Sequence, residues 1–425
     1  MVTAERGIVI VGAGLAGAKA AEELRDAGYD GRVILVGREL TAPYDRPPLS
    51  KDYLTGAQER DEAFVHASGW YAEHDVELHL GQPATAIDRE AKEVVLADDT
   101  RLPYDRLLLA TGSDARTLDV PGADLAGIHV LRTMPDAERL RSTLRTLGRD
   151  NGHLLVVGAG WLGLEIAAAA RGHGAEVTVA ETAPTALHAV LGAEIGSVFE
   201  DMHRAHGVRF EFGAQIAEFR GHDGMVLAAA TRDGEELPAH AVAVAIGAAP
   251  CLALPRGAGL ELAERDEGGG VLVDEQLRTS DPDVFAAGDI VSAPWAALGG
   301  RRLRVEHWAC AGDGGPVAAR AMLGEKPEGP ATWQAKVPYF FTDQYALGME
   351  YAGWAPPGHY DQVVVRGEAG EESEWMAFWL KEGRIAAGMN VNVWDVNEQI
   401  QQLIREDRPV DLTALADPAV PLTDL

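Results

Sequence analysis

Two glycine-rich turns of the same kind constrain the fold of this chain more than any other feature. Residues 12–17 (GAGLAG) follow the apolar run 8–11, and residues 158–163 (GAGWLG) follow the apolar run 154–157. In a G-x-G-x-x-G turn between strand and helix, the glycines allow a tight turn, close approach of a pyrophosphate and close helix packing. The helix start offers N–H groups and a positive dipole end to the phosphates. Two such turns in matched context predict two dinucleotides held side by side and electron transfer between them.

The segments around the two turns repeat the same order of elements. We expect a strand at 8–11, a helix at 15–27 and a strand at 33–36, and again a strand at 154–157, a helix at 162–171 and a strand at 177–180. This is an internal duplication of a mononucleotide-binding half. Further buried runs at 106–112, 241–247 and 284–289 end in a glycine or Gly-Asp turn, which suits ligands bound at the carboxyl ends of a parallel sheet. The pattern predicts an α/β fold with two Rossmann-like domains.

A change in composition near Leu323 predicts a further C-terminal domain. Residues 324–330 form a Gly/Pro-rich linker, and aromatic residues concentrate beyond it. The segments 375–380 and 385–391, separated by a Lys-Glu-Gly-Arg turn, are typical of an antiparallel hairpin. A helix is expected at 396–405, with Asp395 as its N-cap. We interpret this α+β region as a packed core with an interface surface.

Composition excludes several classes of function. The formal charge of −29 argues against nucleic-acid binding and against anionic membrane surfaces. The only cysteines, Cys251 and Cys310, imply no disulfide framework, and no apolar run approaches the roughly 20 residues of a membrane span. We therefore expect a cytoplasmic protein. One basic cluster, Arg301, Arg302 and Arg304, stands out in this acidic chain.

The second turn has its own selectivity signal. Glu181 ends the strand at 177–180, where a carboxylate accepts hydrogen bonds from a ribose 2′-OH and repels a 2′-phosphate. No arginine follows at 182–185, so NADH is predicted over NADPH. In the first unit Gly37 takes the place of Glu181, and Glu39 is the nearest carboxylate. Whether Glu39 or the backbone holds a ribose there is open.

Five further motifs occur in the order of a known family. They are residues 43–51 (PYDRPPLSK), 110–113 (ATGS), 163–165 (GLE), 287–289 (AGD) and 306–308 (EHW). Over nearly its whole length the chain resembles the bacterial FAD-dependent NADH:ferredoxin reductases of the putidaredoxin, rhodocoxin and rubredoxin reductase type. The resemblance implies a glutathione-reductase-like flavoprotein that passes electrons from NADH through FAD to a small iron–sulfur ferredoxin. That ferredoxin would supply a haem-thiolate (P-450) monooxygenase or a ring-hydroxylating oxygenase.

The resemblance also implies domain limits and site residues. Residues 1–112 and 240–323 would form the FAD-binding domain, 113–239 the NAD-binding domain and 324–425 the C-terminal interface domain. The implied cofactor-binding residues are Gly12, Gly14, Leu15, Ala16, Gly17, Glu39, Arg46, Lys51, Ala110, Thr111, Gly112, Arg132, Gly158, Gly160, Trp161, Leu162, Gly163, Glu165, Glu181, Gly247, Gly288, Asp289, Glu306, His307 and Trp308. No metal site is expected.

Three of these residues are expected to be catalytic: Lys51, Glu165 and Trp308. By resemblance, Lys51 pairs with Glu165, in the first turn of the nicotinamide-site helix, beside the flavin N5 where hydride arrives. Trp308 lies near the isoalloxazine, at the start of a helix whose dipole favours the negative charge of reduced flavin. Asp289 hydrogen-bonds the FAD ribityl chain, and Arg46 lies along the flavin.

The chain departs from the family pattern at a few positions and leaves two alternatives open. Residues 338–341 (PYFF) lack expected tryptophans, Cys251 stands where a polar residue is usual, and Arg38 replaces an acidic residue. Dithiol reductases are excluded because no cysteine precedes Cys251. A monodehydroascorbate-reductase-like enzyme and an apoptosis-inducing-factor-like flavin-binding protein remain possible. We expect a monomer or homodimer whose basic cluster at 301–304 steers an acidic ferredoxin.

Overall fold

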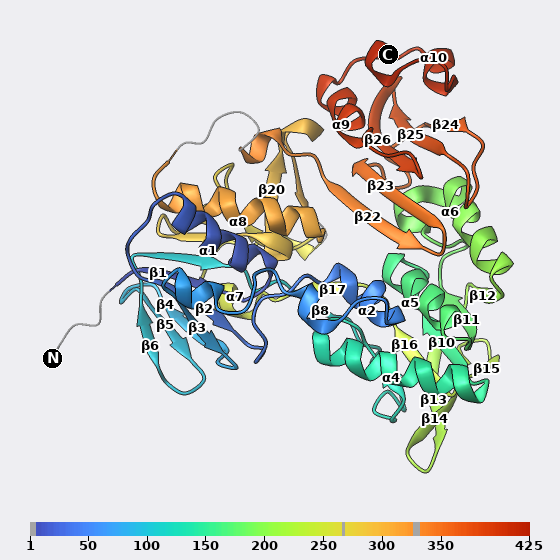
Figure 1. Cartoon of the computed structure of the whole chain (residues 1–425), viewed down its shortest axis with the longest axis horizontal. Coiled ribbons are helices and arrows are strands. Elements are labelled where there is room, and N and C mark those ends of the chain that lie inside the picture. Colours follow the sequence, from blue (N-terminus) through green and yellow to red (C-terminus); the bar gives the residue numbers. More distant parts are fainter. Residues whose placement is uncertain (1–5, 266–267, 326–331) are drawn as a thin grey trace. The chain divides into compact units, whose positions relative to one another are not determined.

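The computed structural model describes residues 6–265, 268–325 and 332–425, and the chain divides into two compact units (Figure 1). Unit 1 is made of Met1–Asp45, Asp61–Asp114 and Pro250–Tyr339, and unit 2 of Arg46–Arg60, Ala115–Ala249 and Phe340–Leu425. The chain passes from one unit to the other after Asp45, Arg60, Asp114, Ala249 and Tyr339, and two of these passages lie in β8 (Ser113–Ala115) and β17 (Ala248–Pro250). Each unit contains one of the two glycine-rich turns.

Unit 1 is built on a five-stranded parallel sheet in the order β19-β7-β1-β2-β3. Its strands are β19 (Val284–Ala286), β7 (Arg106–Leu109), β1 (Ile8–Val11), β2 (Val33–Gly37) and β3 (Val76–Leu80). Every residue of β1 and β2 is buried, as expected for a strand covered on both faces. Helix α1 (Leu15–Asp26) packs closely against α8 (Trp308–Met322). The strand–helix–strand unit predicted around the first turn is therefore confirmed.

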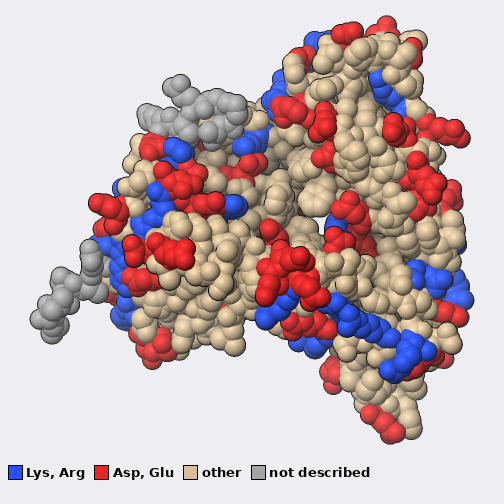
Figure 2. Space-filling view, viewed as in Figure 1, with Lys and Arg blue, Asp and Glu red and all other residues tan. Residues whose placement is uncertain are grey.

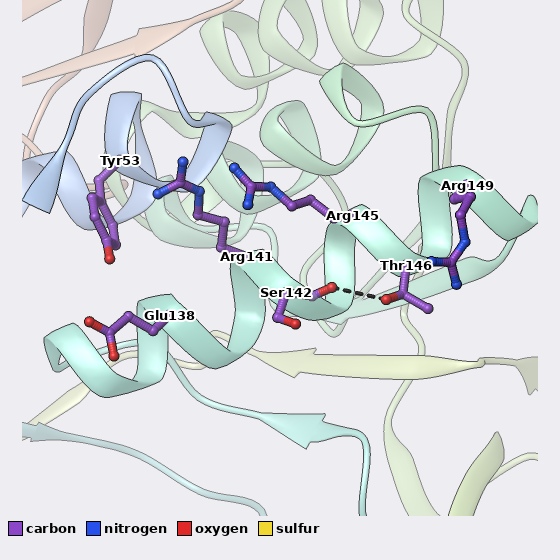
Figure 3. A pocket seen from close by; sticks show the side chains of 7 residues that line it. All are labelled: Tyr53, Glu138, Arg141, Ser142, Arg145, Thr146 and Arg149. Carbon is purple, nitrogen blue, oxygen red and sulfur yellow. Dashed lines mark hydrogen bonds between the residues drawn. The ribbon is translucent and has the colours of Figure 1, made fainter.

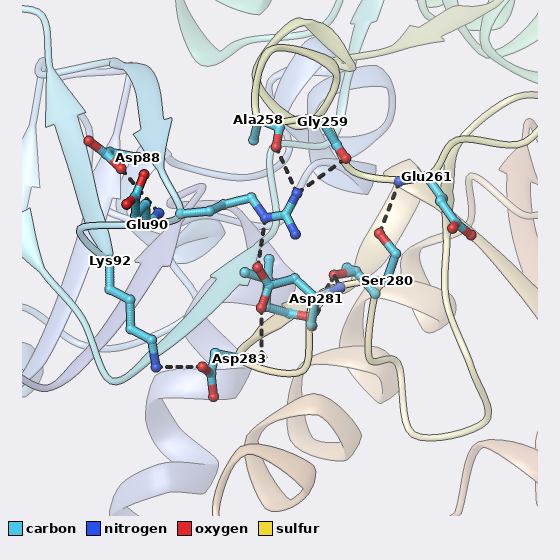
Figure 4. A network of polar contacts seen from close by, with 12 residues as sticks. Asp88, Glu90, Lys92, Ala258, Gly259, Glu261, Ser280, Asp281 and Asp283 are labelled. Carbon is cyan, nitrogen blue, oxygen red and sulfur yellow. Dashed lines mark hydrogen bonds and ion pairs between the residues drawn. The ribbon is translucent and has the colours of Figure 1, made fainter.

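Two small sheets and short helices complete unit 1. One sheet is antiparallel, β4 (Ala84–Asp88), β5 (Glu93–Leu96) and β6 (Arg101–Pro103), and the other consists of β18 (Val271–Leu272), β20 (Val291–Trp295) and β21 (Arg301–Arg304). The helices are α3 (Trp70–Glu73) and α7 (Ala253–Gly257). A polar network ties the β4–β5 turn to the segment before β19 (Figure 4). In it Arg89 donates to Asp281 at 2.7 Å and Lys92 pairs with Asp283 at 2.5 Å.

Unit 2 contains a second five-stranded parallel sheet, in the order β12-β11-β10-β16-β9. Its strands are β12 (Val208–Phe212), β11 (Glu176–Glu181), β10 (His153–Val157), β16 (Ala241–Val244) and β9 (Ile128–His129). The helices of this part are α2 (Asp52–Thr55), α4 (Met134–Asp150), α5 (Trp161–Gly172) and α6 (His188–Ala205). An antiparallel sheet of β13 (Ile216–His222), β14 (Met225–Thr231) and β15 (Glu236–Pro238) is attached. The second strand–helix–strand unit is confirmed as well.

The C-terminal part of unit 2 holds a five-stranded sheet in the order β22-β23-β26-β25-β24. Its strands are β22 (Tyr339–Gln344), β23 (Leu347–Gly353), β24 (Gln362–Gly367), β25 (Trp375–Lys381) and β26 (Arg384–Val391), followed by α9 (Asn397–Glu406) and α10 (Leu412–Ala416). The predicted hairpin is confirmed by the antiparallel pairing of β25 with β26. Of the predicted linker, residues 326–330 lie outside the described ranges.

The predicted N-cap of the last long helix was wrong. Helix α9 begins at Asn397 and its N-cap is Val396, which makes no side-chain cap hydrogen bond. Asp395 lies one residue earlier in the left-handed region, at φ 63°. Helix α9 is held instead by its buried face, Ile400, Leu403 and Ile404. Within the described ranges, no helix is long and apolar enough to cross a membrane.

Candidate dinucleotide-binding sites

The two glycine-rich turns have nearly the same backbone geometry. Gly12 has φ 129° and Gly158 has φ 106°, values that L side chains rarely adopt. A Cβ on Gly12 would fall 2.0 Å from the carbonyl oxygen of Ala110, and a Cβ on Gly158 would fall 2.4 Å from that of Ala245. The first glycine of each turn is therefore required both by its backbone conformation and by the neighbouring strand end.

The other glycines leave room for a phosphate at each helix start. A Cβ on Gly14 or Gly160 would meet no atom within 4 Å, so the space before each helix is open. Both are N-cap residues without a side-chain cap hydrogen bond, which leaves N–H groups of the first turn for a ligand. A Cβ on Gly17 would lie 2.0 Å from the oxygen of Gly12, which explains the third glycine. Each turn thus fits a dinucleotide pyrophosphate.

The strands beside the two turns end differently. The register pairs Val11 with Val36 and Val157 with Ala180, so Gly37 and Glu181 occupy equivalent positions. Glu181 accepts hydrogen bonds from the backbone N–H groups of Ala159 and Ala183, both at 2.8 Å.

A side chain at position 37 has no room. Its Cβ would lie 2.7 Å from the Cβ of Ala13. Two residues later, the carboxylate of Glu39 accepts a hydrogen bond from the hydroxyl of Tyr44 at 2.6 Å. The first turn therefore has a carboxylate near its strand end, but at a different position and already bonded to a tyrosine.

Further predicted residues of unit 1 gather at the ends of β7 and β19. Ala110, Thr111 and Gly112 follow β7, and the Thr111 hydroxyl donates to the carbonyl of Cys251 at 3.1 Å. Gly288, at φ 77°, follows β19, and a Cβ there would lie 3.3 Å from the Cβ of Ala16 in α1. The backbone at Gly288–Asp289 thus runs close to the first turn of α1.

Trp308 begins helix α8, as predicted, and His307 is its N-cap. Burial of the imidazole lowers the pKa of His307 to about 4, although the nearby Asp289 carboxylate acts in the opposite direction. Trp308 is 44% exposed, and its Nε1–H donates to the Asp45 carboxylate at 2.6 Å. A large aromatic ring is therefore presented to solvent at a helix N-terminus in unit 1.

The predicted pair of Lys51 and Glu165 is present in unit 2. The Lys51 ammonium lies 2.5 Å from the Glu165 carboxylate, and their side chains are only 11% and 7% exposed. The hydroxyls of Ser50 and Thr342 also donate to this carboxylate, each at 2.5 Å. The ring of Phe341 lies 5.5 Å from the Lys51 nitrogen. Three donors therefore offset the cost of burying the carboxylate charge. A buried charge without such partners would destabilise the protein.

One detail of this prediction was wrong. Helix α5 begins at Trp161 and has no acidic residue in its first turn, so Glu165 lies in the second turn. The carboxylate is therefore held by side-chain donors more than by the end of the helix dipole, whose effect is concentrated in the first turn. Ser50 and Thr342 were not predicted. Ser50 adjoins Lys51 in the motif, whereas Thr342 gave no signal beyond its place after the aromatic pair 340–341.

A chain of buried hydrogen bonds continues from Thr342. Gln344 donates to the Thr342 hydroxyl at 3.2 Å and lies 2.8 Å from Nε2 of His203, and the Tyr345 hydroxyl lies 3.2 Å from Nδ1. This arrangement assigns the proton to Nε2, which donates to the amide oxygen. Burial lowers the pKa of His203 to about 4. Burial also raises the pKa of Asp343, with Lys51 opposing.

The remaining predicted residues lie in less specific surroundings. Arg46 donates to the backbone carbonyl of Arg132. Trp161, which precedes Leu162 in the first turn of α5, packs its ring 5.0 Å from that of Phe340. Gly247 has φ 95°.

Two arginines of the basic cluster on β21 make contacts within unit 1. Arg302 donates to the carbonyl of Val273 at 2.8 Å. Arg304 pairs with Glu306, which also accepts from Ser113, and the Arg304 side chain is only 10% exposed. Within the described part of the chain, no three His, Cys, Asp or Glu side chains gather as a metal-ligand group.

The chain is similar to known proteins over almost its whole length. The pyridine nucleotide-disulphide oxidoreductase family model matches residues 6–315, and the reductase C-terminal model matches residues 339–425. The rhodocoxin reductase of Rhodococcus erythropolis is 37% identical over 85% of this chain and 80% of its own. The ferredoxin–NAD(+) reductase component of the biphenyl dioxygenase system of Paraburkholderia xenovorans is 37% identical, covering 98% of each chain. In the crystal structure of the covalent putidaredoxin reductase–putidaredoxin complex, a chain matches with a TM-score of 0.91 and 33% identity, covering 99% of this chain and 98% of the other.

Proposed function

The chain belongs to the pyridine nucleotide-disulphide oxidoreductase family, and from that premise we propose that it carries electrons from NADH through FAD to an iron–sulfur ferredoxin. The observation that carries this proposal is the pair of matched dinucleotide turns, one in each unit. A single turn would suit any nucleotide-dependent enzyme. Two turns suit an enzyme that keeps one dinucleotide and exchanges another.

We assign NADH to the second turn and FAD to the first. Glu181 supports the NADH assignment because its carboxylate lies beside the turn, where it suits a ribose hydroxyl and repels a 2′-phosphate. FAD, when bound, accepts two electrons as hydride and returns them singly to a one-electron acceptor. In unit 1, Gly288 and Asp289 would line the pyrophosphate and ribityl region, and Trp308 would cover the ring system.

We assign Lys51 and Glu165 to positioning the nicotinamide at the second turn. The pair is buried and saturated with donors, so its geometry is rigid. A rigid pair next to the turn can fix the nicotinamide ring and exclude water from the hydride path. No general acid, metal or protein nucleophile is needed for this reaction.

Two alternatives make different predictions about the electron acceptor. Two relatives that match over at least 96% of both chains are named as a putidaredoxin reductase and a ferredoxin–NAD(+) reductase component, which favours ferredoxin over a small-molecule acceptor or an apoptosis-inducing-factor-like role. Steady-state NADH oxidation, measured with ferredoxin plus cytochrome c, with ferricyanide, with monodehydroascorbate and without acceptor, tests the proposal. Fast turnover of cytochrome c only with ferredoxin present is the expected result. Fast reduction of monodehydroascorbate without it would overturn the proposal.

We propose that the ferredoxin docks near β21 through Arg301, Arg302 and Arg304 and then serves a downstream P-450 or ring-hydroxylating oxygenase. Because Arg304 is paired with Glu306 and mostly buried, Arg301 and Arg302 would provide most of the steering. Replacing Arg301 and Arg302 by glutamate should lower the ferredoxin on-rate at low salt and leave ferricyanide reduction unchanged. An unchanged on-rate would show that the ferredoxin does not dock at this strand. We further propose a cytoplasmic location and a monomer or homodimer.

A further inference from the structure

Three arginines line a pocket on helix α4 that takes no part in the proposed reaction. Arg141, Arg145 and Arg149 are spaced four residues apart, so their side chains follow one another along one face of the helix. The pocket has a volume of about 350 Å³ and is also lined by Tyr53, Glu138, Ser142 and Thr146 (Figure 3). Figure 2 shows the corresponding band of Lys and Arg side chains over α4, although the chain as a whole is strongly acidic.

Two of these arginines lack the partners that other arginines of the chain have. Within the described ranges, Arg141 and Arg145 take part in no hydrogen bond and no ion pair, and the buried Nε of Arg141 has no hydrogen-bond partner. The guanidinium of Arg141 lies 5.1 Å from the centre of the Tyr53 ring. By contrast, Arg149 pairs with Asp150 at 2.8 Å. Buried donors are usually satisfied, so a buried unpaired guanidinium nitrogen requires an explanation.

The two unpaired guanidinium groups converge on one point. A Cβ on Gly56, the C-cap of α2, would lie 2.9 Å from Nη2 of Arg141 and 3.3 Å from Nη2 of Arg145. Figure 3 shows both groups reaching toward the helix that carries Tyr53. Like charges so close repel each other unless an anion lies between them. The only carboxylate lining the pocket, Glu138, already lies 3.4 Å from Arg60.

We propose that this pocket binds a small molecule through a phosphate group. Guanidinium forks match phosphate oxygens in pairs, and two forks together balance a dianion. The hydroxyls of Ser142 and Thr146 lie in the same pocket and can reach further oxygens. Its volume of about 350 Å³ lies within the range of small-ligand sites. The pocket is separate from both glycine-rich turns, because none of its lining residues belongs to either turn.

Isothermal titration calorimetry tests this site in FAD-loaded protein saturated with NAD⁺, so that both turns are occupied. The probes are inorganic phosphate and glucose 6-phosphate at constant ionic strength, with chloride as the reference anion. The variants are Arg141→Gln/Arg145→Gln and the matched control Arg139→Gln, which removes an exposed arginine of the same helix that pairs with Asp136 outside the pocket. We expect the double variant to bind about tenfold more weakly or worse, since charged hydrogen bonds are lost, and the control to match the unchanged protein.

The outcomes separate the sources of the phosphate group. Equal affinity for both probes identifies a free-phosphate site, and a clear preference for glucose 6-phosphate identifies a phosphorylated metabolite; both support the proposal. Equal binding by the double variant, or binding no tighter than chloride, overturns it. If the glutamine double variant does not fold, Arg141→Lys/Arg145→Lys keeps the charge but removes the forks, and we still expect weaker phosphate binding.

Discussion

The glycine-rich turns of unit 1 and unit 2 share their backbone and differ in what surrounds it. In both, the N–H of the first glycine donates at 2.8 Å to the neighbouring strand, to Val36 for Gly12 and to Ala180 for Gly158. At the next position of that strand, the first unit has Gly37 and the second has Glu181. The two units thus share the backbone of the turn and differ in the residue at the end of the neighbouring strand.

The helices that follow the turns also differ. Helix α1 is covered closely by α8, where a Cβ on Gly315 would lie 2.4 Å from the carbonyl oxygen of Ala16. Helix α5 instead carries the buried carboxylate of Glu165, bound by Lys51 and two hydroxyls. Tight cover suits a resident cofactor, whereas a polar buried group beside the turn suits a ligand that must be oriented at each turnover. This difference supports FAD at the first turn and NADH at the second.

The largest effect is expected from alanine at the first glycine of each turn. Gly12→Ala should abolish FAD binding, because its Cβ would meet the Ala110 oxygen and φ 129° is unfavourable for alanine. Gly158→Ala should keep FAD but slow flavin reduction by NADH by roughly 100-fold or more. The flavin-to-protein absorbance ratio and stopped-flow reduction measure the two effects.

Gly172→Ala, at an open position in α5, is the matched control and should change neither quantity. If Gly158→Ala lost FAD while Gly12→Ala retained it, the two cofactor assignments would have to be exchanged.

The next effect concerns the carboxylate that distinguishes α5 from α1. Glu165→Ala should slow flavin reduction by NADH by roughly 10- to 100-fold. Lys51 would lose its partner, and the nicotinamide ring would no longer be held by a rigid pair. FAD should remain bound. Glu165→Gln keeps the side-chain shape and should recover part of the rate. A normal reduction rate in a folded Glu165→Ala protein would show that Glu165 has no role in hydride transfer.

The elements that follow local rules could be predicted from the sequence. The turns, their strands and the equivalence of Gly37 with Glu181 follow from apolar runs, glycine spacing and strand register, which are local. Thr342 could not be predicted, because its bond to Glu165 joins segments 177 residues apart and depends on how β22 packs. The pocket on α4 could not be predicted for the same reason, because it is also lined by Tyr53 of α2, which is distant in the sequence.

A prediction from local sequence was also wrong where tertiary packing stabilises the element instead. The cap expected from Asp395 is absent because the buried face of α9 stabilises the helix without it. Residue types therefore indicated the pair of Lys51 and Glu165, and only the packed structure showed that Ser50 and Thr342 also donate to this carboxylate.

A smaller effect is expected at the strand ends. Glu181→Ser removes the carboxylate that accepts from Ala159 and should raise the ratio of NADPH to NADH activity about tenfold, because repulsion of a 2′-phosphate is lost. Glu39→Ser, made at the nearest carboxylate of the first turn, should leave that ratio unchanged. Steady-state kcat/KM with both nucleotides gives the ratio. An equal shift in both variants would show that the strand ends do not distinguish the two turns.

The smallest expected effect is on the pH dependence of stability, which can be compared between the two units. Each unit has one histidine whose pKa burial lowers to about 4, His307 in unit 1 and the fully buried His203 in unit 2. The unfolded chain binds a proton on such a group near pH 6.5, while the folded protein does so only near pH 4. Acidification across this window therefore favours unfolding. For His203 the free energy of unfolding should fall by about 1 kcal/mol between pH 7 and pH 5.5.

Urea unfolding at the two pH values measures this loss in the unchanged protein and in His203→Gln, which cannot titrate. The variant should start less stable, since it disturbs the hydrogen bonds to Gln344 and Tyr345, but its stability should depend less on pH. The matched His307→Gln should flatten the profile to a similar extent, since burial lowers the pKa of His307 to about 4 as well. If His203→Gln retained the full pH dependence, the acid sensitivity of unit 2 would have to come from other groups, among them His129 and His153, whose pKa values burial also lowers. The hydrogen-bond chain that ends at Glu165 would then have no titrating member in this window.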